Sequence, residues 1–277
     1  MNDGPLSPHE TRELLARLAH MPKKWLGQNF LVDGNIVRKS LELGEVRPGD
    51  RVVEIGPGLG TLTRTLLCAG AEVHAVEADR TMHFHLTESL GARFPDTFHL
   101  TEGDAVEMPR AGLQDPPDGS FKVIANLPYA ISTPWMDAIC AGPHPSLMVL
   151  MLQKEAADRL TAEVGTGHWS AVTAQVSLAF EKVKTHPVPA QSFNPPPKVD
   201  SCLLVLRRRP DARRFSPRAR EVARMLFTQR RKQVGSAAKK LFPGAADVAA
   251  WLGELPRFGL TGLARPETIP AEAWLSL

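Results

Sequence analysis

The sequence is poor in cysteine and has no long apolar run. Its 277 residues include only three cysteines, Cys68, Cys140 and Cys202, scattered among apolar neighbours. An odd number of cysteines without metal-ligand spacing argues against a disulfide framework and a metal site, and favours buried thiols in a reducing cytosol. No apolar run approaches the roughly 18 residues of a membrane span, and the N-terminus lacks the pattern of a signal peptide. We therefore expect a cytoplasmic protein without membrane contact or bound metal.

Acidic residues are scarce in one region, and this concentrates positive charge there. The net charge of the chain is only +3, but residues 207–240 contain 13 Lys and Arg against two acidic residues, Asp211 and Glu221. The remaining residues are net negative, with 20 basic and 28 acidic side chains. Such a block is typical of a surface that binds a polyanion. A solvated helix face is the alternative, but so many like charges without counter-charges favour a nucleic-acid surface.

Short apolar runs alternate with helical spacing through the first two thirds of the chain. Strands are predicted at 51–55, 71–77, 98–104, 121–126 and 146–153, with helical segments at 8–20, 61–70, 81–90 and 154–164. This alternation predicts an α/β fold with a doubly wound, Rossmann-like parallel sheet. The run 202–208 predicts an added antiparallel strand, and the chain beyond 211 reads as helical. We expect three parts: an N-terminal helical extension (1–22), the sheet domain (23–209) and a basic helical domain (210–277).

A glycine-rich turn follows the first predicted strand. Glu54, Gly56, Gly58 and Gly60 form an E-x-G-x-G-x-G pattern, whereas the dinucleotide pattern G-x-G-x-x-G would require glycine at Thr61. The spacing is that of S-adenosylmethionine-binding enzymes. Glycines let the backbone approach a cofactor closely. An acidic residue is acceptable here because a sulfonium cofactor brings no pyrophosphate. A simple tight turn is the alternative.

Acidic residues end the next two predicted strands. Glu77 ends the second strand, where a carboxylate can accept both hydroxyls of a ribose. Asp104 ends the third strand and could accept a hydrogen bond from an adenine amino group. Either residue alone could be a solvated strand end. The carboxyl ends of parallel strands share one edge of a sheet, however, and ligands bind there. The order of these residues therefore predicts a cofactor site.

The fourth predicted strand ends in the tetrapeptide NLPY, Asn126 to Tyr129. The side-chain oxygen of Asn126 and the carbonyl of Pro128 could hold the N–H groups of an adenine amine, and Tyr129 could stack on the base, worth about 1–3 kcal/mol. Phe193, ahead of a proline-rich segment, could form the second wall of the pocket. Such a pocket requires an unpaired or flipped adenine. We assign Asn126, Leu127, Pro128, Tyr129 and Phe193 to catalysis, and Asn126 to the cofactor site as well; a β-turn with a buried tyrosine is the alternative.

Several motifs together resemble the ribosomal RNA adenine dimethyltransferase family, and within it the small-subunit (16S) branch. The resemblance runs from about Lys23 to Lys240. It is carried by KKWLGQNFL (23–31), EIGPGLGTLT (54–63), VEAD (76–79), NLPYAIST (126–133), LQKEAADRL (152–160), FNPPPKVDS (193–201) and FTQRRKQ (227–233). It implies two successive methyl transfers to N6 of each of two adjacent adenosines near the 3′ end of small-subunit rRNA, with S-adenosylmethionine as cofactor.

The resemblance also implies roles for further residues. Gln28, Asn29 and Leu31 would help to line the mouth of the cofactor site, and the substrate would be a partly assembled small ribosomal subunit. For RNA binding we select Arg207, Arg208, Arg230, Arg231 and Lys232, and we expect a monomer. Two positions depart from the family pattern: Ala130 replaces the asparagine common after NLPY, and Trp169 replaces a tyrosine.

Three other functions compete with this interpretation. The related large-subunit methyltransferase of the macrolide-resistance type is disfavoured by FTQRRKQ and FNPPPKVDS. A non-catalytic RNA-binding assembly or transcription factor is disfavoured because the glycine pattern, Glu77, Asp104 and NLPY are all intact. A nicotinamide dehydrogenase is disfavoured by Thr61 and by the lack of a convincing catalytic acid–base residue.

Overall fold

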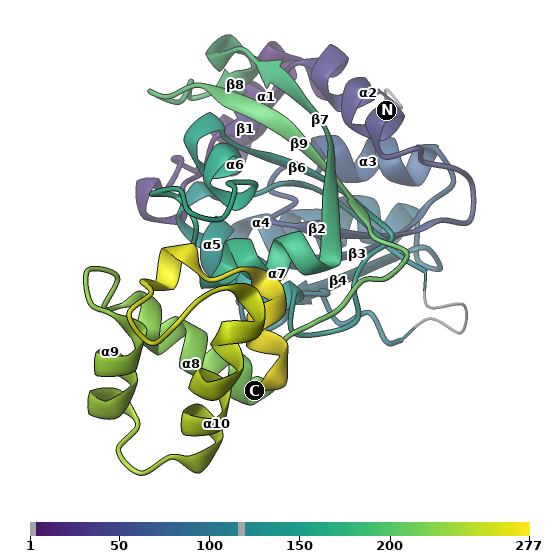
Figure 1. Ribbon diagram of the computed structural model, residues 1–277. Coiled ribbons are helices and arrows are strands. Elements are labelled where there is room, and N and C mark those ends of the chain that lie inside the picture. The colour runs from purple at the N-terminus through teal and green to yellow at the C-terminus, as the bar shows by residue number, and fades with distance from the viewer. Residues whose placement is uncertain (1–3, 116–119) are drawn as a thin grey trace. The chain divides into compact units, whose positions relative to one another are not determined.

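The computed structural model describes residues 4–115 and 120–277 (Figure 1). Contacts along the chain divide it into two compact units. The sheet unit comprises the described residues up to Ile139 together with Pro143–Ala157 and Lys182–Arg207, and the helical unit comprises Cys140–Gly142, Asp158–Glu181 and Arg208–Leu277. The last part of the helical unit begins two residues before Pro210, where the composition suggests a boundary. The unit also takes in 158–181, which the sequence pattern places with the sheet.

A mixed sheet forms the centre of the sheet unit (Figure 1). Within the described residues its strand order is β4 (Phe98–Glu102), β3 (Glu72–Glu77), β2 (Arg51–Ile55), β5 (Lys122–Asn126), β6 (Leu147–Gln153), β9 (Ser201–Arg208) and β7 (Phe180–Val188). The strands from β4 to β6 pair in parallel, and β9 pairs antiparallel with β6. The predicted Rossmann-like sheet, including its antiparallel addition, is confirmed.

The apolar character of the strands explains this arrangement. Six consecutive residues of β6, 147–152, are buried. Because successive side chains point to opposite faces, both faces of the sheet must be covered there. The chain runs from β2 outward to β3 and β4, and then returns to place β5 on the other side of β2. Such a reversal opens a crevice at the carboxyl ends of the two central strands, where doubly wound proteins bind ligands.

Helices of 7–11 residues connect the strands and build the helical unit. They are α1 (Pro8–Arg17), α2 (Gly34–Leu43), α3 (Thr61–Cys68), α4 (Arg80–Leu86), α5 (Ser132–Ile139), α6 (Lys154–Leu160), α7 (Ala171–Ala179), α8 (Pro217–Phe227), α9 (Val234–Leu241) and α10 (Ala246–Glu254). Two short strands, β1 (Phe30–Leu31) and β8 (Phe193–Asn194), pair antiparallel. None of these helices is long and apolar enough to cross a membrane.

The N-terminal helix packs near the glycine-rich turn. Ser7 caps α1, and the Glu10 side chain accepts a hydrogen bond from the Ser7 N–H in return. Leu14 and Leu15 belong to a buried apolar cluster that includes Leu59 of the glycine-rich turn. The helix predicted at 8–20 therefore exists, although it ends at Arg17, and it supports the turn from outside.

The cysteines differ in their environment. Cys140 and Cys202 are buried, but Cys68 is exposed and none is in a disulfide. The expectation of buried thiols is therefore wrong for Cys68. The reason is its place at the last residue of α3, where the amphipathic helix turns this side chain to solvent while Leu66 and Leu67 face the core.

Candidate active site

A cavity of about 450 Å³ lies at the carboxyl ends of β2, β3, β4 and β5. Every residue that lines it belongs to the sheet unit. The cavity brings together most of the residues predicted for the cofactor and catalytic sites: Gln28, Asn29, Leu31, Glu54, Gly56, Gly58, Glu77, Asp104, Asn126, Leu127, Pro128 and Tyr129. Gly60, Phe193 and the predicted RNA-binding residues do not line it. Segments distant in sequence thus meet at one edge of the sheet.

The glycine-rich turn is shaped by what lies against it. Gly56 has φ +64°, and a Cβ there would lie 3.4 Å from Cγ of Pro128, so the turn packs directly on the NLPY segment. Gly60 has φ +80°, and a Cβ there would lie 2.7 Å from a methyl carbon of Leu86 in α4. Side chains are disfavoured at both positions, since positive φ strains residues other than glycine. The lack of a side chain at Gly60 therefore allows the turn to pack against α4. At Gly56 it allows the glycine-rich turn and the NLPY segment to lie close together.

Glu77 joins the end of β3 to the glycine-rich turn. One of its carboxylate oxygens accepts a hydrogen bond from the Gly58 N–H at 3.0 Å, and the other accepts from the Asp79 N–H at 2.8 Å. The residue is 6% exposed, and burial raises the pKa of its carboxyl. A carboxylate has about four acceptor sites, so both oxygens retain capacity for further hydrogen bonds. The position of the carboxylate is thus fixed by backbone groups before any ligand arrives.

Glu54 is buried beside the cavity with an unsatisfied oxygen. It is 2% exposed, and its Oε2 accepts no hydrogen bond from the residues that the structure describes. Burial, together with the nearby Glu77, raises the pKa of its carboxyl to about 8. A buried acceptor without a partner is costly, and a positive or hydrogen-donating ligand would remove that cost.

The charge of the cavity wall is one-sided. Glu54, Glu77, Glu102 and Asp104 line it, and no Lys, Arg or His is found among the described residues that do so. Asp104 is exposed, and its side chain accepts a hydrogen bond from the Val106 N–H at 2.7 Å. The ionised members of this wall repel a pyrophosphate and attract a cation, and a bound cation would also favour ionisation of Glu54. The dehydrogenase alternative is disfavoured on this ground, and a positively charged ligand fits.

Asn126 is anchored through its amide nitrogen. Nδ2 donates a hydrogen bond to the backbone carbonyl of Asn29 at 3.0 Å, whereas Oδ1 accepts none from the described part of the chain. The carbonyl of Pro128 accepts from the Ile131 N–H at 3.1 Å, and the carbonyl of Leu127 receives no hydrogen bond from any described residue. Thus at least two acceptor oxygens beside the cavity are unused.

The two predicted stacking residues have different environments. Tyr129 lines the cavity, and its hydroxyl is 2.7 Å from Oγ of Ser201, which fixes the tip of the ring. Burial raises the pKa of this hydroxyl. Phe193 is 3% exposed and belongs to the apolar core cluster of the sheet unit. A base could stack on Phe193 only after a change in that packing.

A polar network beside the cavity was not foreseen from the sequence. The Asp79 side chain accepts hydrogen bonds from Nε2 of Gln28 and Nζ of Lys23, both at 2.9 Å. Oε1 of Gln28 in turn accepts from the Lys23 N–H and lies 2.9 Å from Nε2 of His20. Burial opposes ionisation of Asp79, but the hydrogen bonds from Lys23 and Gln28 hold the pKa of its carboxyl below its usual range. The motifs KKWLGQNFL and VEAD contain Lys23, Gln28 and Asp79 but not His20, and only the fold shows that these side chains touch.

The network fixes a segment that carries an exposed aromatic side chain to the cavity mouth. Trp25 lines the cavity and is nevertheless 76% exposed. It lies in a short 3₁₀ turn, Lys24–Leu26, between the network residues Lys23 and Gln28. An indole held in this way presents a flat surface to solvent at the cavity that the NLPY segment also lines.

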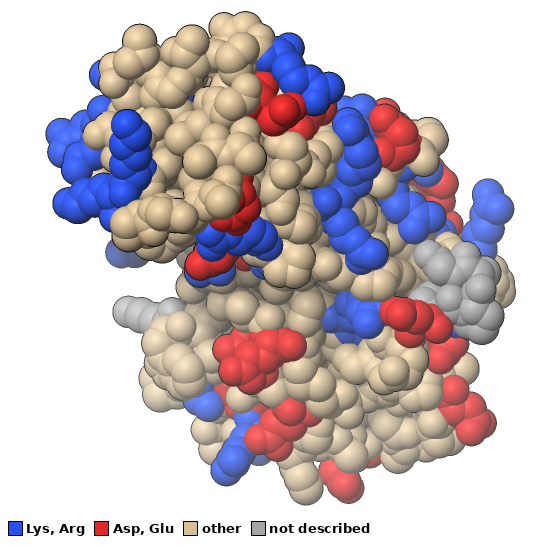
Figure 2. All heavy atoms as spheres, turned by 60° about the horizontal axis from the view of Figure 1, so that its bottom comes forward, with Lys and Arg blue, Asp and Glu red and all other residues tan. Residues whose placement is uncertain are grey.

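The predicted RNA-binding residues differ in how they are engaged. Arg207, in the sheet unit, forms an ion pair with Glu45 at 2.6 Å, and Arg230 donates a hydrogen bond to the carbonyl of Gly167 at 2.8 Å. Arg231 and Lys232 are exposed, and the described residues form no ion pair with them. Figure 2 shows Lys and Arg side chains gathered on one side of the helical unit (upper left). The charge block therefore reaches solvent and is only partly neutralised.

Comparison with known proteins places this geometry among the RNA methyltransferases. Residues 19–253 match the family model described as "Ribosomal RNA adenine dimethylase". A protein of Opitutus terrae named "Ribosomal RNA small subunit methyltransferase A" is 55% identical over 273 residues, which cover 99% of this chain and 98% of that protein. A protein of the same name from Lactobacillus acidophilus is 35% identical, with 100% and 97% covered.

Solved structures agree with the sequence comparison. A dimethyladenosine transferase from Plasmodium falciparum superposes with a TM-score of 0.66 at 25% identity, covering 89% of this chain and 95% of that one. The 23S rRNA methyltransferase ErmE superposes with a TM-score of 0.59 at 27% identity, covering 90% and 97%. The similarity extends over both units, since either coverage exceeds the length of the sheet unit alone.

Proposed function

The chain belongs to the ribosomal RNA adenine dimethylase family, and from that premise we propose that it dimethylates N6 of two adjacent adenosines near the 3′ end of small-subunit rRNA. It is a methyltransferase that uses S-adenosylmethionine. The proposed substrate rests on the two small-subunit enzymes that match it over nearly their full length. The observation that carries the chemistry is the unused Oδ1 of Asn126 beside an acidic cavity.

The residues of the cavity fit this cofactor. S-adenosylmethionine supplies a methyl group bound to a positively charged sulfur. The acidic wall, without a basic residue among its described members, suits that charge. In our proposal Glu77 accepts the ribose hydroxyls and Asp104 the adenine amino group, while Glu54 and the glycines 56, 58 and 60 shape the turn around the cofactor.

The mouth of the cofactor site is formed by the segment that the Asp79 network holds. Gln28, Asn29 and Leu31 all line the cavity. Gln28 is bound on both ends of its amide, so it acts by fixing the segment. Asn29 contributes through its carbonyl, which holds Asn126. This arrangement connects the cofactor side of the cavity to the NLPY side through one hydrogen bond.

The NLPY segment acts by positioning the target amine. Oδ1 of Asn126 and the backbone carbonyls of Leu127 and Pro128 accept the N–H groups of adenine, which turns the nitrogen lone pair toward the methyl group. Because the Pro128 carbonyl already accepts from Ile131, the Leu127 carbonyl is the less encumbered of the two. Tyr129 supports the base by stacking, and Phe193 would add a second wall after repacking. Positioning of this kind can supply roughly 7–11 kcal/mol, so no strong base is needed.

The helical unit is proposed to bind the RNA backbone. Arg208, Arg230, Arg231 and Lys232 belong to it, and Arg207 lies next to its start. Phosphate contacts fix register without reading sequence. The target adenosine would then be selected by the cavity. We further propose that the enzyme is cytoplasmic and monomeric. Size-exclusion chromatography with light scattering would test the oligomeric state.

Methyl transfer from labelled S-adenosylmethionine tests the proposal. Small and large ribosomal subunits that lack the modifications are offered separately to the purified protein. We expect label in the small-subunit RNA, recovered as N6,N6-dimethyladenosine from two adjacent positions. Label confined to large-subunit RNA would instead support the alternative represented by the 23S rRNA methyltransferase of similar fold. Absence of label from both would favour a non-catalytic assembly factor.

A further inference from the structure

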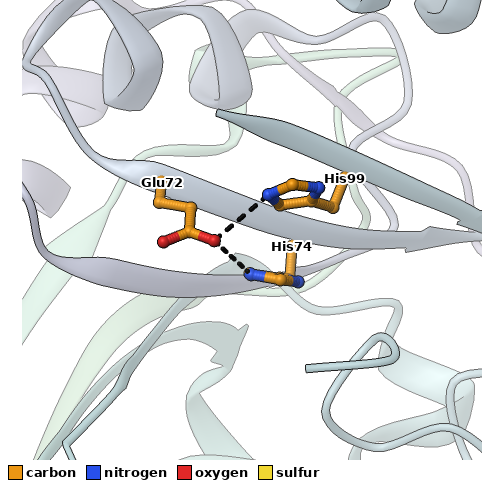
Figure 3. Close-up of side chains that lie close together, drawn as sticks. All are labelled: Glu72, His74 and His99. Atoms are coloured by element: carbon orange, nitrogen blue, oxygen red, sulfur yellow. Dashed lines mark hydrogen bonds and ion pairs between the residues drawn. The ribbon is translucent and has the colours of Figure 1, made fainter. Parts of the chain in front are cut away.

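Three side chains of the types that can bind a metal ion lie close together in the sheet unit, away from the cavity (Figure 3). They are Glu72 and His74 of β3 and His99 of β4. One oxygen of Glu72, Oε1, lies 3.1 Å from Nε2 of His74 and 3.1 Å from Nε2 of His99. All three ligand atoms lie within 4.8 Å of one another. The proposed methyl transfer has no use for this cluster.

The sheet itself produces the convergence. Glu72 and His74 are two residues apart on β3, so their side chains share one face. His99 is the register partner of His74 on the adjacent strand β4, which brings the two imidazoles together on that face. Their rings stack with centroids 4.4 Å apart. The ligand geometry is therefore fixed by strand pairing and does not depend on a loop.

The distances suit a small divalent ion. Zinc binds imidazole nitrogen and carboxylate oxygen at about 2.0–2.2 Å in tetrahedral sites. Two ligands of such an ion lie roughly 3.3–3.5 Å apart by that geometry, close to the 3.1 Å that separates the Glu72 oxygen from each imidazole nitrogen. The two imidazole nitrogens lie within 4.8 Å of each other, so the stacked rings would turn toward one another to bind the same ion. Each neutral imidazole then carries its proton on Nδ1 and offers the lone pair of Nε2.

The surroundings allow an ion to enter and remain. The side chains of His99 and Glu72 are 42% and 35% exposed, so solvent reaches the cluster, whereas that of His74 is 13% exposed and held in place. Nε of Arg51 lies 3.8 Å from the other Glu72 oxygen, Oε2. It would orient the carboxylate so that Oε1 faces the imidazoles. Solvent would complete the coordination as a fourth ligand.

We propose that Glu72, His74 and His99 form a zinc site that ties the edge strand β4 to β3. Glu72 is the first residue of β3 and Glu77 the last. At a rise of about 3.3 Å per residue, roughly 16 Å of strand separates the site from the cofactor cavity. The ion would therefore take no part in the methyl transfer, and its ligands from two strands would tie the outermost strand to its neighbour.

Zinc titration of chelator-treated protein tests the site. We expect one equivalent of Zn²⁺ to bind with a Kd of roughly micromolar or tighter and to raise the Tm by several degrees, since a ligand that binds only the folded state stabilises it. His99→Ala should weaken binding at least tenfold and abolish the Tm increase. His99→Ala is a tolerable change because the side chain is partly exposed, and His74→Ala should repeat its effect.

Two control variants separate this site from incidental binding. Cys68→Ser removes an exposed thiol that could bind zinc, and His168→Ala removes an exposed histidine of the helical unit. Both should retain the wild-type affinity and Tm increase. The proposal is overturned if wild-type protein binds no zinc, or if His99→Ala binds it as tightly as wild type while Cys68→Ser loses it. In either case the cluster is only two stacked histidines that are each hydrogen-bonded to Glu72.

Discussion

The two polar atoms of the Asn126 side chain have different roles, one structural and one proposed for catalysis. Its nitrogen is used to hold the carbonyl of Asn29, which leaves its oxygen directed by a fixed amide plane. The same division is seen at Glu77, whose oxygens each accept one backbone N–H and keep further capacity. At the residue scale the site is thus preorganised by the protein's own hydrogen bonds.

Replacing Asn126 with alanine should stop catalysis and spare cofactor binding. The change removes the acceptor proposed to orient the adenine amine, and loss of one such positioned group costs roughly 10²–10³-fold in rate. Single-turnover methyl transfer and calorimetric titration of S-adenosylmethionine measure the two effects separately. If cofactor affinity fell by the same factor as turnover, Asn126 would act in cofactor binding alone and not in positioning the amine.

Glu54 should make the unliganded protein less stable as the pH rises. Its folded-state pKa of about 8 lies above the ordinary value of 4.5, so the folded protein holds a proton that the unfolded chain has lost. The free energy of unfolding therefore falls from about pH 4.5 to pH 8 and then levels off, by an amount on the order of a few kcal/mol. Glu77, whose pKa is also raised, acts in the same direction.

Urea unfolding of wild-type protein and of Glu54→Gln across that pH range measures this contribution. The glutamine variant cannot ionise at this position. Its free energy of unfolding, relative to that of wild type, should therefore increase as the pH rises from about 4.5 to 8. Curves that stay parallel from about pH 4.5 to pH 8 would mean that Glu54 is ionised in the folded protein.

At the scale of elements, the predictions succeeded where burial left a clear pattern. The strand at 51–55 matches β2, and the antiparallel strand at 202–208 matches β9 within one residue, because both are apolar runs in a covered sheet. β7 could not be foreseen, since five consecutive residues, 181–185, are exposed on this edge strand. α7 is buried on nearly every side and so lacks helical periodicity.

The candidate site was predictable to a similar extent. Motifs at strand ends identified the residues around the cavity because a parallel sheet brings those ends together. The Asp79 network could not be derived, since it joins residues 51 positions apart through side-chain hydrogen bonds. Nor could the burial of Phe193 be foreseen, because pairing of β1 with β8 is what carries it into the core.

The N-terminal segment should loosen when Asp79 is removed. Asp79→Ala takes away the shared partner of Lys23, Gln28 and His20, so amide exchange in residues 20–29 should accelerate roughly tenfold or more while the central strands stay protected. Hydrogen-exchange mass spectrometry measures this. Asp33→Ala is the matched control: it removes the N-cap of α2 and should affect that helix instead. Unchanged exchange at 20–29 would show that the network does not hold the segment.

Across the whole molecule, charge is segregated by unit. The cavity of the sheet unit is acidic, whereas residues 207–240 carry 13 basic side chains against two acidic ones. The cationic cofactor therefore meets an acidic surface, and the polyanionic substrate meets a basic one. Because the basic groups concentrate RNA by releasing counterions, their contribution should depend on salt.

Arg231 and Lys232 should contribute measurably to that salt dependence. The double alanine variant should bind RNA more weakly and reduce the slope of log K against log salt by roughly 0.7–0.9 for each phosphate that is no longer neutralised. Filter binding across a salt series measures the slope. Arg257→Ala, which removes an exposed arginine paired with Glu254, serves as the control and should leave the slope unchanged. An unaltered slope in the double variant would exclude these two residues from the RNA-binding surface.

The exposed indole of Trp25 has one further consequence, which is optical. The chain has five tryptophans, and the other four, Trp135, Trp169, Trp251 and Trp274, are at most 4% exposed. A quencher such as iodide, dissolved in the buffer, will therefore quench the fluorescence of Trp25 and leave that of the other four tryptophans almost unchanged. Shielding of that emission would report, without any label, whether a ligand covers the mouth of the cavity.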